Sequence, residues 1–257
     1  MSSPTRPAFL VVCGGWHPPA AYDKLREQLE GRGLEYRCPP LPSMGPSAAG
    51  VTYHADVDAI RAAALPLFEQ GREVVLVAHS AGGVPAVVAT QGFETSQRAA
   101  RGEKGGFKQI IFIAAVVIPI RGSDTLQTLG GSWQPGQGGA EPYTKNNLMT
   151  LSKGAEKVLY SDLADAEAEA YSDLFQPHSQ DAFETPVDYI AADAGVPMTY
   201  IVTETDAVFP AFAQRALLEA ASVPNVKLDS IETSHSPFAS QPERLADMVV
   251  RIAGGAA

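Results

Sequence analysis

Short apolar runs of strand length alternate with helix-like segments along most of the chain, and this order constrains the fold more than any other feature. The stretch Ala8 to Cys13 is a continuous apolar run ended by two glycines, and Val74 to Val77 is a second such run. Strands that are apolar at every position are buried on both faces, which is typical of parallel sheets. Because parallel strands need right-handed crossovers, the order predicts a mostly parallel central sheet with helices on both faces.

The remaining elements follow from the same patterns. Apolar runs predict strands at 34–37, 107–118, 198–202 and 226–231, and helical spacing predicts helices at 20–30, 53–68 and about 83–91. Pro66 is expected to break or kink the last turn of its helix. The alternation stops over about 119–188, where a glycine-rich stretch precedes a helix that Ser161 or Asp162 can cap. We interpret residues 1–257 as a single domain in which this segment is an inserted cap.

Composition and charge exclude several classes of function. Hydrophobic residues make up 45% and charged residues 19% of the 257 residues, which suits a folded chain with a sizeable core. The net charge of -10, with no cluster of Lys and Arg, disfavours a nucleic-acid partner. The two cysteines, Cys13 and Cys38, offer neither a disulfide framework nor a metal-ligand pattern. Without a signal-like N-terminus or a run of about 18 apolar residues, the expected location is cytoplasmic, with no membrane partner.

One junction between a predicted strand and a predicted helix carries reactive chemistry. The segment Ala78-His79-Ser80-Ala81-Gly82 matches the nucleophile elbow G-x-S-x-G, with Ala78 in place of the first glycine. The tight turn needs small residues two before and two after the serine, because these positions press against the neighbouring strand and helix. A glycine-rich helix cap without chemistry is the alternative. The order of strand, motif and helix favours Ser80 as a nucleophile.

A serine nucleophile needs a base to take its proton and an acid to orient that base. His235 follows the run at 226–231 and Asp206 follows the run at 198–202, so both are expected at the carboxyl edge of the sheet. The chain order of serine, aspartate and histidine is the one expected after such an elbow. Glu204 is the nearest rival acid, and Asp124 is a reserve. Structural or binding roles are expected for the other histidines, which are His17, His54, His79 and His178.

The oxyanion and the substrate need their own contacts. We expect the backbone N–H groups of Ala81 and of Gly15, in the loop after the first strand, to bind the oxyanion, although two glycines there could also form a simple turn. A pocket is expected between the strand ends and the cap. Five aromatic side chains could line it, although each taken singly is more often a core residue: Trp16, Trp133, Tyr143, Phe175 and Phe209.

Three stretches together resemble a known family. The segments 11–17, 77–83 and 235–238 are similar to those of small α/β-hydrolases related to plant methylesterases and hydroxynitrile lyases. The resemblance spans nearly the whole chain and implies the α/β-hydrolase fold, a triad of Ser80, Asp206 and His235, and no metal or organic cofactor. Many relatives carry His-Gly where this chain has Cys13-Gly14, so the resemblance does not extend to the geometry of the oxyanion loop. A closer similarity to fungal and actinobacterial hydrolases identifies a subgroup and no substrate.

These observations predict a serine hydrolase of the carboxylic ester class, which cleaves an ester or lactone of a small hydrophobic molecule through an acyl-enzyme. One alternative uses the same triad to form a lactone by internal acyl transfer or to cleave a carbon–carbon bond. The lyase reaction needs a positioned cation, for which Lys145 and Lys153 in the cap are the candidates. The other alternative is a non-catalytic receptor for small molecules, against which the complete triad argues. The sequence is compatible with a homodimer and does not decide the oligomeric state.

Overall fold

A six-stranded parallel sheet forms the centre of the molecule. The computed structural model describes residues 6–131 and 146–254. The strand order is β2-β1-β3-β4-β7-β8, and every neighbouring pair is parallel. The strands are β1 (Ala8–Val12), β2 (Tyr36–Arg37), β3 (Glu73–His79), β4 (Gly106–Ile113), β7 (Met198–Thr203) and β8 (Lys227–Ile231). The predicted mostly parallel sheet is therefore confirmed, and its carboxyl edge gathers the loops that follow β1, β3, β7 and β8.

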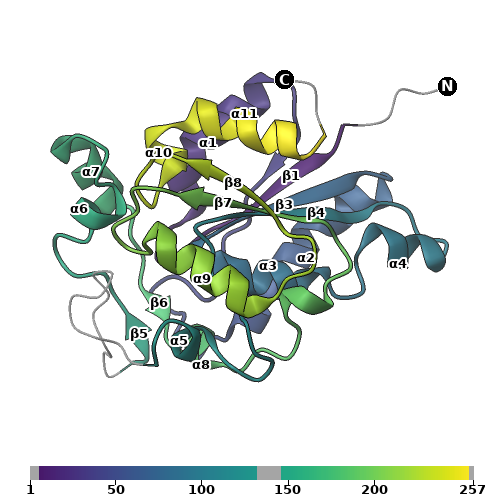
Figure 1. Cartoon of the computed structure of the whole chain (residues 1–257), viewed down its shortest axis with the longest axis horizontal. Coiled ribbons are helices and arrows are strands. Elements are labelled where there is room, and N and C mark those ends of the chain that lie inside the picture. The colour runs from purple at the N-terminus through teal and green to yellow at the C-terminus, as the bar shows by residue number, and fades with distance from the viewer. Residues whose placement is uncertain (1–5, 132–145, 255–257) are drawn as a thin grey trace.

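Helices cover both faces of this sheet. In the view of Figure 1, α1 and α11 lie above the sheet, and α2, α3 and α9 lie below it. The helices of this layered part are η1 (Pro19–Tyr22), α1 (Asp23–Gly31), α2 (Tyr53–Glu69), η2 (Ser80–Gly82), α3 (Gly83–Thr90), α4 (Thr95–Ala100), α9 (Ala211–Ala221), α10 (Pro237–Ser240) and α11 (Pro242–Ile252). Among the described residues, no helix is both long enough and apolar enough to cross a membrane.

Two elements of this part of the chain end at other places than the sequence predicts. Helix α2 is not broken at Pro66 and continues to Glu69, with the buried side chains of Leu67 and Phe68 packed against the core. Strand β4 ends at Ile113, whereas its apolar run continues to residue 118. Ala114 adopts a φ of 44°, a left-handed conformation that ends the strand, and the remaining apolar residues are buried in a loop. The N–H of Val116 in that loop donates to the carbonyl of Ser80.

The segment between β4 and β7 carries short elements outside the main sheet. They are α5 (Thr125–Thr128), β5 (Leu148–Met149), α6 (Glu156–Leu159), α7 (Asp165–Ser172), β6 (His178–Ser179), α8 (Asp181–Glu184) and η3 (Ala191–Asp193). Strands β5 and β6 form a small antiparallel pair (Figure 1). Helix α7 begins after Ala164, which makes no side-chain cap, so the expected cap by Ser161 or Asp162 is wrong. The role of the segment as a cap, within a single domain, stays a prediction.

Two glycines allow α3 to start directly against the ends of two strands. A Cβ atom on Gly82 would lie 2.4 Å from the carbonyl oxygen of Cys13, which follows β1. A Cβ atom on Gly83 would lie 2.3 Å from the carbonyl oxygen of Val116, which follows β4. Real Cβ atoms do not approach backbone oxygens so closely, and neither backbone can move without disturbing the sheet. The close packing of the start of α3 against the ends of β1 and β4 therefore depends on both glycines.

The substitution Gly83→Ala is expected to lower the free energy of unfolding by roughly 3 kcal/mol, the upper end of the range for overpacking, because the new methyl group meets a fixed carbonyl. The control is Gly31→Ala at the exposed end of α1, where a Cβ would meet nothing within 4 Å. That control should be neutral or stabilise the protein by up to about 1 kcal/mol. Urea unfolding followed by circular dichroism measures both values. Equal stabilities of the two variants would contradict this account of how α3 is seated.

Candidate active site

Ser80 lies on a sharp turn at the carboxyl end of β3. Its backbone φ is 50°, although it is not a glycine, and a 3-10 turn from Ser80 to Gly82 leads directly into α3. Such a left-handed conformation is costly for a residue with a side chain, so the surrounding structure must hold it in place. The bond from Val116 N–H to the carbonyl of Ser80, 2.9 Å long, is one contact that does so. The serine is half-buried and therefore remains reachable from outside.

His235 and Asp206 form a buried pair next to this edge. His235 Nδ1 lies 2.7 Å from Asp206 Oδ2. The other carboxylate oxygen, Oδ1, accepts hydrogen bonds from the N–H groups of Val208 and Phe209, both 2.8 Å long. Burial alone would raise the pKa of Asp206, but the adjacent His235 and these hydrogen bonds outweigh it and lower that pKa below its ordinary value. The ionised carboxylate therefore fixes the proton on His235 Nδ1 and leaves Nε2 as the basic nitrogen.

The two rival acids have other partners. Glu204 forms an ion pair with Arg215, at 2.5 Å between Oε1 and Nη2. Asp124 caps α5, where its Oδ1 accepts a hydrogen bond from the N–H of Gln127 at 2.7 Å. Of the three carboxylates considered from the sequence, Asp206 is thus the one hydrogen-bonded to His235.

The side chains of Tyr22 and His79 connect three loops through one chain of hydrogen bonds. The N–H of Gly14 donates to Tyr22 Oη at 2.8 Å, and the Tyr22 hydroxyl in turn lies 2.8 Å from His79 Nδ1. His79 Nε2 lies 2.9 Å from the carbonyl oxygen of His235, which can only accept. Burial and the nearby His235 and His17 lower the pKa of His79 well below its ordinary value, so the ring is neutral. Each group therefore has one possible role. The Tyr22 hydroxyl donates to His79 Nδ1, and His79 Nε2 donates to the carbonyl oxygen of His235.

The loop after β1 is shaped by its glycines and by a second histidine. A Cβ on Gly14 would lie 2.6 Å from His79 Nδ1, so only glycine fits there. The carbonyl of Gly15 accepts a hydrogen bond from His17 Nδ1 at 2.6 Å. Burial lowers the pKa of His17 to about 4, so this ring is neutral too. A Cβ atom on Gly15 would lie 3.8 Å from Ala81 Cβ. The two residues expected to bind an oxyanion are therefore close together.

Asp162 anchors the loop that carries His235, a role that the sequence did not reveal. Its Oδ1 accepts from the Ser234 hydroxyl at 2.5 Å, and its Oδ2 accepts from the Ser234 N–H at 3.0 Å. The two residues are 72 positions apart in the chain, and nothing local to either of them signals the pairing. The carboxylate that we expected to cap α7 thus binds the residue directly before His235.

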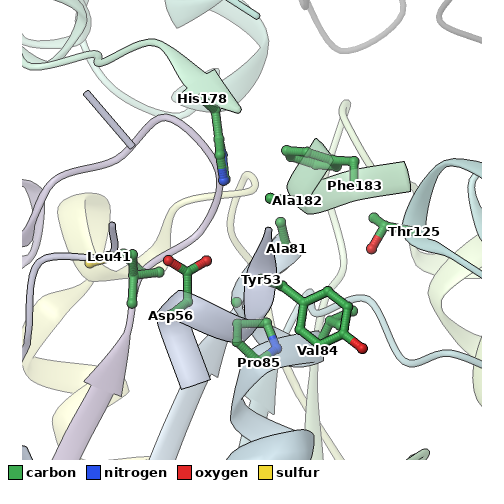
Figure 2. A pocket seen from close by; sticks show the side chains of 12 residues that line it. Leu41, Tyr53, Asp56, Ala81, Val84, Pro85, Thr125, His178, Ala182 and Phe183 are labelled. Carbon is green, nitrogen blue, oxygen red and sulfur yellow. The ribbon is translucent and has the colours of Figure 1, made fainter. Parts of the chain in front are cut away.

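A cavity is lined by Ala81 and Gly82, the two residues that follow Ser80 in the chain, and Figure 2 shows it with Ala81 labelled. It contains about 300 Å³ of space not filled by atoms, part of it open to solvent. Its walls are mostly apolar and come from the loop after β1, from α2, from the start of α3 and from the segment between β4 and β7. The lining residues are Cys13, Leu41, Tyr53, Asp56, Ala81, Gly82, Val84, Pro85, Thr125, His178, Ala182 and Phe183. None of these described residues is a lysine or an arginine.

The aromatic residues predicted to line the pocket have several locations. Trp16 stacks on Phe183, a lining residue, with 5.7 Å between the ring centroids. Phe175 packs edge-on against His17, and Phe209 contributes its N–H to Asp206. None of these three residues lines this cavity, and their contact with a substrate stays a prediction. Trp133 and Tyr143 lie outside the described residues, as does Lys145, whereas Lys153 is exposed.

Two buried polar residues at one wall of this cavity, Ser43 and Asp56, were not predicted from the sequence, whereas His178 beside them was expected to have a structural or binding role. One signal could have revealed Asp56. It lies on the same face of α2 as Tyr53, Val57 and Ile60, which is buried, so a carboxylate interrupts an otherwise apolar stripe. The described parts of the chain contain no group of three or more side chains placed to hold a metal ion.

Comparison with known proteins finds one matching family and several proteins of the same fold. The model of the Alpha/beta hydrolase family matches residues 9–248. The chain is 27% identical over 255 residues to the alpha/beta hydrolase nvfD of Aspergillus novofumigatus, covering 98% of each chain. Among solved structures, an extracellular alpha/beta-hydrolase from a Paenibacillus species superposes with a TM-score of 0.76 at 16% identity, over 95% of this chain and 98% of the other. The Arabidopsis methylesterase MES16 superposes with a TM-score of 0.72 at 21% identity, over 96% and 99%.

The substitution Tyr22→Phe is expected to destabilise the protein by roughly 2 kcal/mol, because it leaves the buried Gly14 N–H and His79 Nδ1 without a partner. The control is Tyr36→Phe, which removes a buried hydroxyl that has no hydrogen-bond partner among the described residues. That control should be neutral or slightly stabilising. Urea unfolding measures both, and a Tyr22→Phe variant as stable as the control would contradict the proposed connection of the loops.

Proposed function

The chain belongs to the alpha/beta hydrolase family, and we propose that it is a serine esterase acting on an ester or lactone of a small hydrophobic molecule. The single observation that carries this proposal is the buried pair of His235 and Asp206 at the sheet edge where Ser80 turns out of β3. The chain order of Ser80, Asp206 and His235 is the one expected for this fold, which supports their proposed roles as nucleophile, acid and base. The structurally similar Arabidopsis protein MES16 is a methylesterase, which is in keeping with ester chemistry.

In the proposed reaction, Ser80 Oγ attacks the carbonyl carbon while His235 Nε2 takes the hydroxyl proton. Asp206 keeps the other ring nitrogen protonated and stabilises the imidazolium that forms. The tetrahedral intermediate collapses to an acyl-enzyme as the alcohol leaves with the proton from His235. Water, deprotonated by the same histidine, then releases the acid and restores Ser80.

We propose that the backbone N–H groups of Gly15 and Ala81 stabilise the negative charge on the carbonyl oxygen. The close approach of these two residues supports this assignment. The mostly apolar walls of the cavity favour a hydrophobic substrate. Because no lysine or arginine lines the described walls, hydrolysis is favoured over a lyase reaction, which needs a cation near the leaving group. The oriented His235 and Asp206 likewise argue against a non-catalytic receptor.

Labelling by a fluorophosphonate probe and turnover of p-nitrophenyl esters test this proposal. We expect wild-type protein to be labelled at Ser80, and Ser80→Ala to lose labelling and at least roughly 10³-fold in kcat/KM, because the nucleophile is gone. The exposed Ser161→Ala variant is the matched control and should behave like wild type. Folded wild-type protein that is neither labelled nor active, or full activity in Ser80→Ala, would overturn the proposal.

Asp162 is expected to act as a positioning residue for the base. The substitution Asp162→Ala removes both bonds to Ser234 and should lower kcat roughly tenfold by displacing His235, with little change in KM. The substitution Asp162→Asn, which keeps one acceptor, should restore part of the loss. The control is Asp165→Ala in the exposed first turn of α7. A change confined to KM, or equal losses in Asp162→Ala and the control, would show that Asp162 does not position His235.

A further inference from the structure

Three polar side chains meet at one wall of the cavity, and none of them is hydrogen-bonded to Asp206 or His235 in the described residues. Ser43, Asp56 and His178 are exposed by only 0%, 3% and 4%. Ser43 Oγ lies 2.6 Å from Asp56 Oδ2 and 2.9 Å from His178 Nε2, so the serine bridges the other two. Figure 2 shows the side chains of Asp56, from α2, and His178, from β6, pointing toward each other at this wall. The N–H of Ser179 donates to the carbonyl of Ser43, which fixes the backbones of the two segments together.

The partners of this cluster determine where its protons lie. Burial raises the pKa of Asp56 to about 6, against the opposing effect of two hydrogen bonds from Ser43, so the carboxylate is ionised at neutral pH and only accepts. The single hydroxyl proton of Ser43 therefore points to Asp56. Ser43 Oγ must then accept from His178, whose Nε2 carries the proton. Burial lowers the pKa of His178 to about 3, so the ring is neutral and its Nδ1 is a bare acceptor.

This arrangement is not a second catalytic triad. In a triad the histidine stands between the serine and the acid and takes the serine proton. Here the serine stands in the middle, and its proton is directed at Asp56. Ser43 is also fully buried. The cluster instead fixes the tautomer and the orientation of the His178 ring.

The free nitrogen of that ring lies beside the proposed oxyanion site. His178 Nδ1 is buried and has no hydrogen-bond partner among the described residues. It lies 3.3 Å from the point where a Cβ on Gly15 would stand, and Ala81 Cβ lies 3.8 Å from the same point. The ring of Phe183, 4.7 Å from that of His178 between centroids, forms an apolar wall beside it. A buried acceptor without a donor is unfavourable, and a ligand that supplies the donor recovers that loss.

We propose that His178 Nδ1 accepts a hydrogen bond from a hydroxyl group of the substrate, and that the cavity selects esters or lactones with a free hydroxyl near the reacting carbonyl. This inference rests on the proposed function, since it places the hydroxyl beside the carbonyl that Gly15 and Ala81 are proposed to bind. His178 is then a specificity-determining residue, and Ser43 and Asp56 hold its acceptor toward the ligand. Replacing the hydroxyl by hydrogen leaves the acceptor unsatisfied again, which is how a polar subsite discriminates between close analogues.

The first test measures binding without turnover, in protein carrying Ser80→Ala. The probes are methyl hexanoate and its 2-hydroxy and 3-hydroxy derivatives, titrated by ligand-observed NMR. At least one hydroxy ester should bind about tenfold more tightly than the deoxy ester, as expected for one added hydrogen bond in an apolar site. Adding His178→Gln, whose amide can reach Ser43 but has no atom at the Nδ1 position, should abolish this ratio. Adding His178→Asn, which places an amide oxygen near that position, should keep part of it.

Equal binding of all three esters to the Ser80→Ala protein would overturn the inference, and so would a tenfold ratio that survives His178→Gln. Each variant carries its own reference, because the deoxy ester is measured in the same protein. A preserved binding ratio with no ester turnover in wild type would overturn the proposed esterase activity while supporting the subsite. Turnover of the deoxy ester without any preference for the hydroxy esters would support the esterase activity and overturn the subsite.

A spectroscopic measurement tests the ring directly. In the free protein at neutral pH, the ¹⁵N shift of His178 should identify Nδ1 as unprotonated and Nε2 as protonated. Addition of the preferred hydroxy ester should move the Nδ1 resonance in the direction of a hydrogen-bonded nitrogen. A protonated Nδ1 in the free protein would overturn the proposal.

Discussion

The hydrogen bonds of His79 hold together the parts of the molecule on which its chemistry depends. This buried, neutral ring accepts a hydrogen bond from the Tyr22 hydroxyl and donates one to the carbonyl of His235, while Tyr22 Oη itself accepts from the N–H of Gly14. The loops after β1, β3 and β8 are thereby fixed relative to one another by groups that have no access to water. Because an unpaired polar group in such surroundings is costly, the three loops can move apart only by breaking contacts that nothing else would replace.

Two buried histidines, His178 and His235, are held in opposite tautomers by their neighbours. The carboxylate of Asp206 keeps the proton of His235 on Nδ1, whereas Ser43 and Asp56 keep the proton of His178 on Nε2. The free nitrogen is therefore Nε2 in one ring and Nδ1 in the other. The same side chain can serve in proton transfer at one position and in recognition at the other, because each function requires only that the correct nitrogen be left bare. Both assignments of function are proposals that follow from these partners.

The alternation of apolar runs was sufficient to predict the parallel sheet, because burial on both faces leaves a strong signal in each strand. The same reasoning placed Ser80 after β3 and Asp206 and His235 at the carboxyl edge, since sheet topology brings those loops together. It failed where the outcome depends on contacts between distant segments. The continuation of α2 through Pro66 depends on packing, and the pairing of Asp162 with Ser234 links positions that share no local pattern. Asp56 could have been noticed as a charge on the buried face of α2, but its partners could not.

The chain of contacts through His79 also has a consequence for the order in which the molecule is built. Tyr22, Gly14 and His79 belong to the first third of the chain, whereas the carbonyl that accepts from His79 follows β8, close to the C-terminus. During synthesis on the ribosome, the turn of Ser80 can therefore form before Asp206 and His235 have emerged. At that stage His79 still lacks the carbonyl of His235 that accepts its hydrogen bond. Under the proposed mechanism, a nascent or truncated chain carries an unactivated serine, and reactivity toward esters arises only when the last strand of the sheet has joined the others.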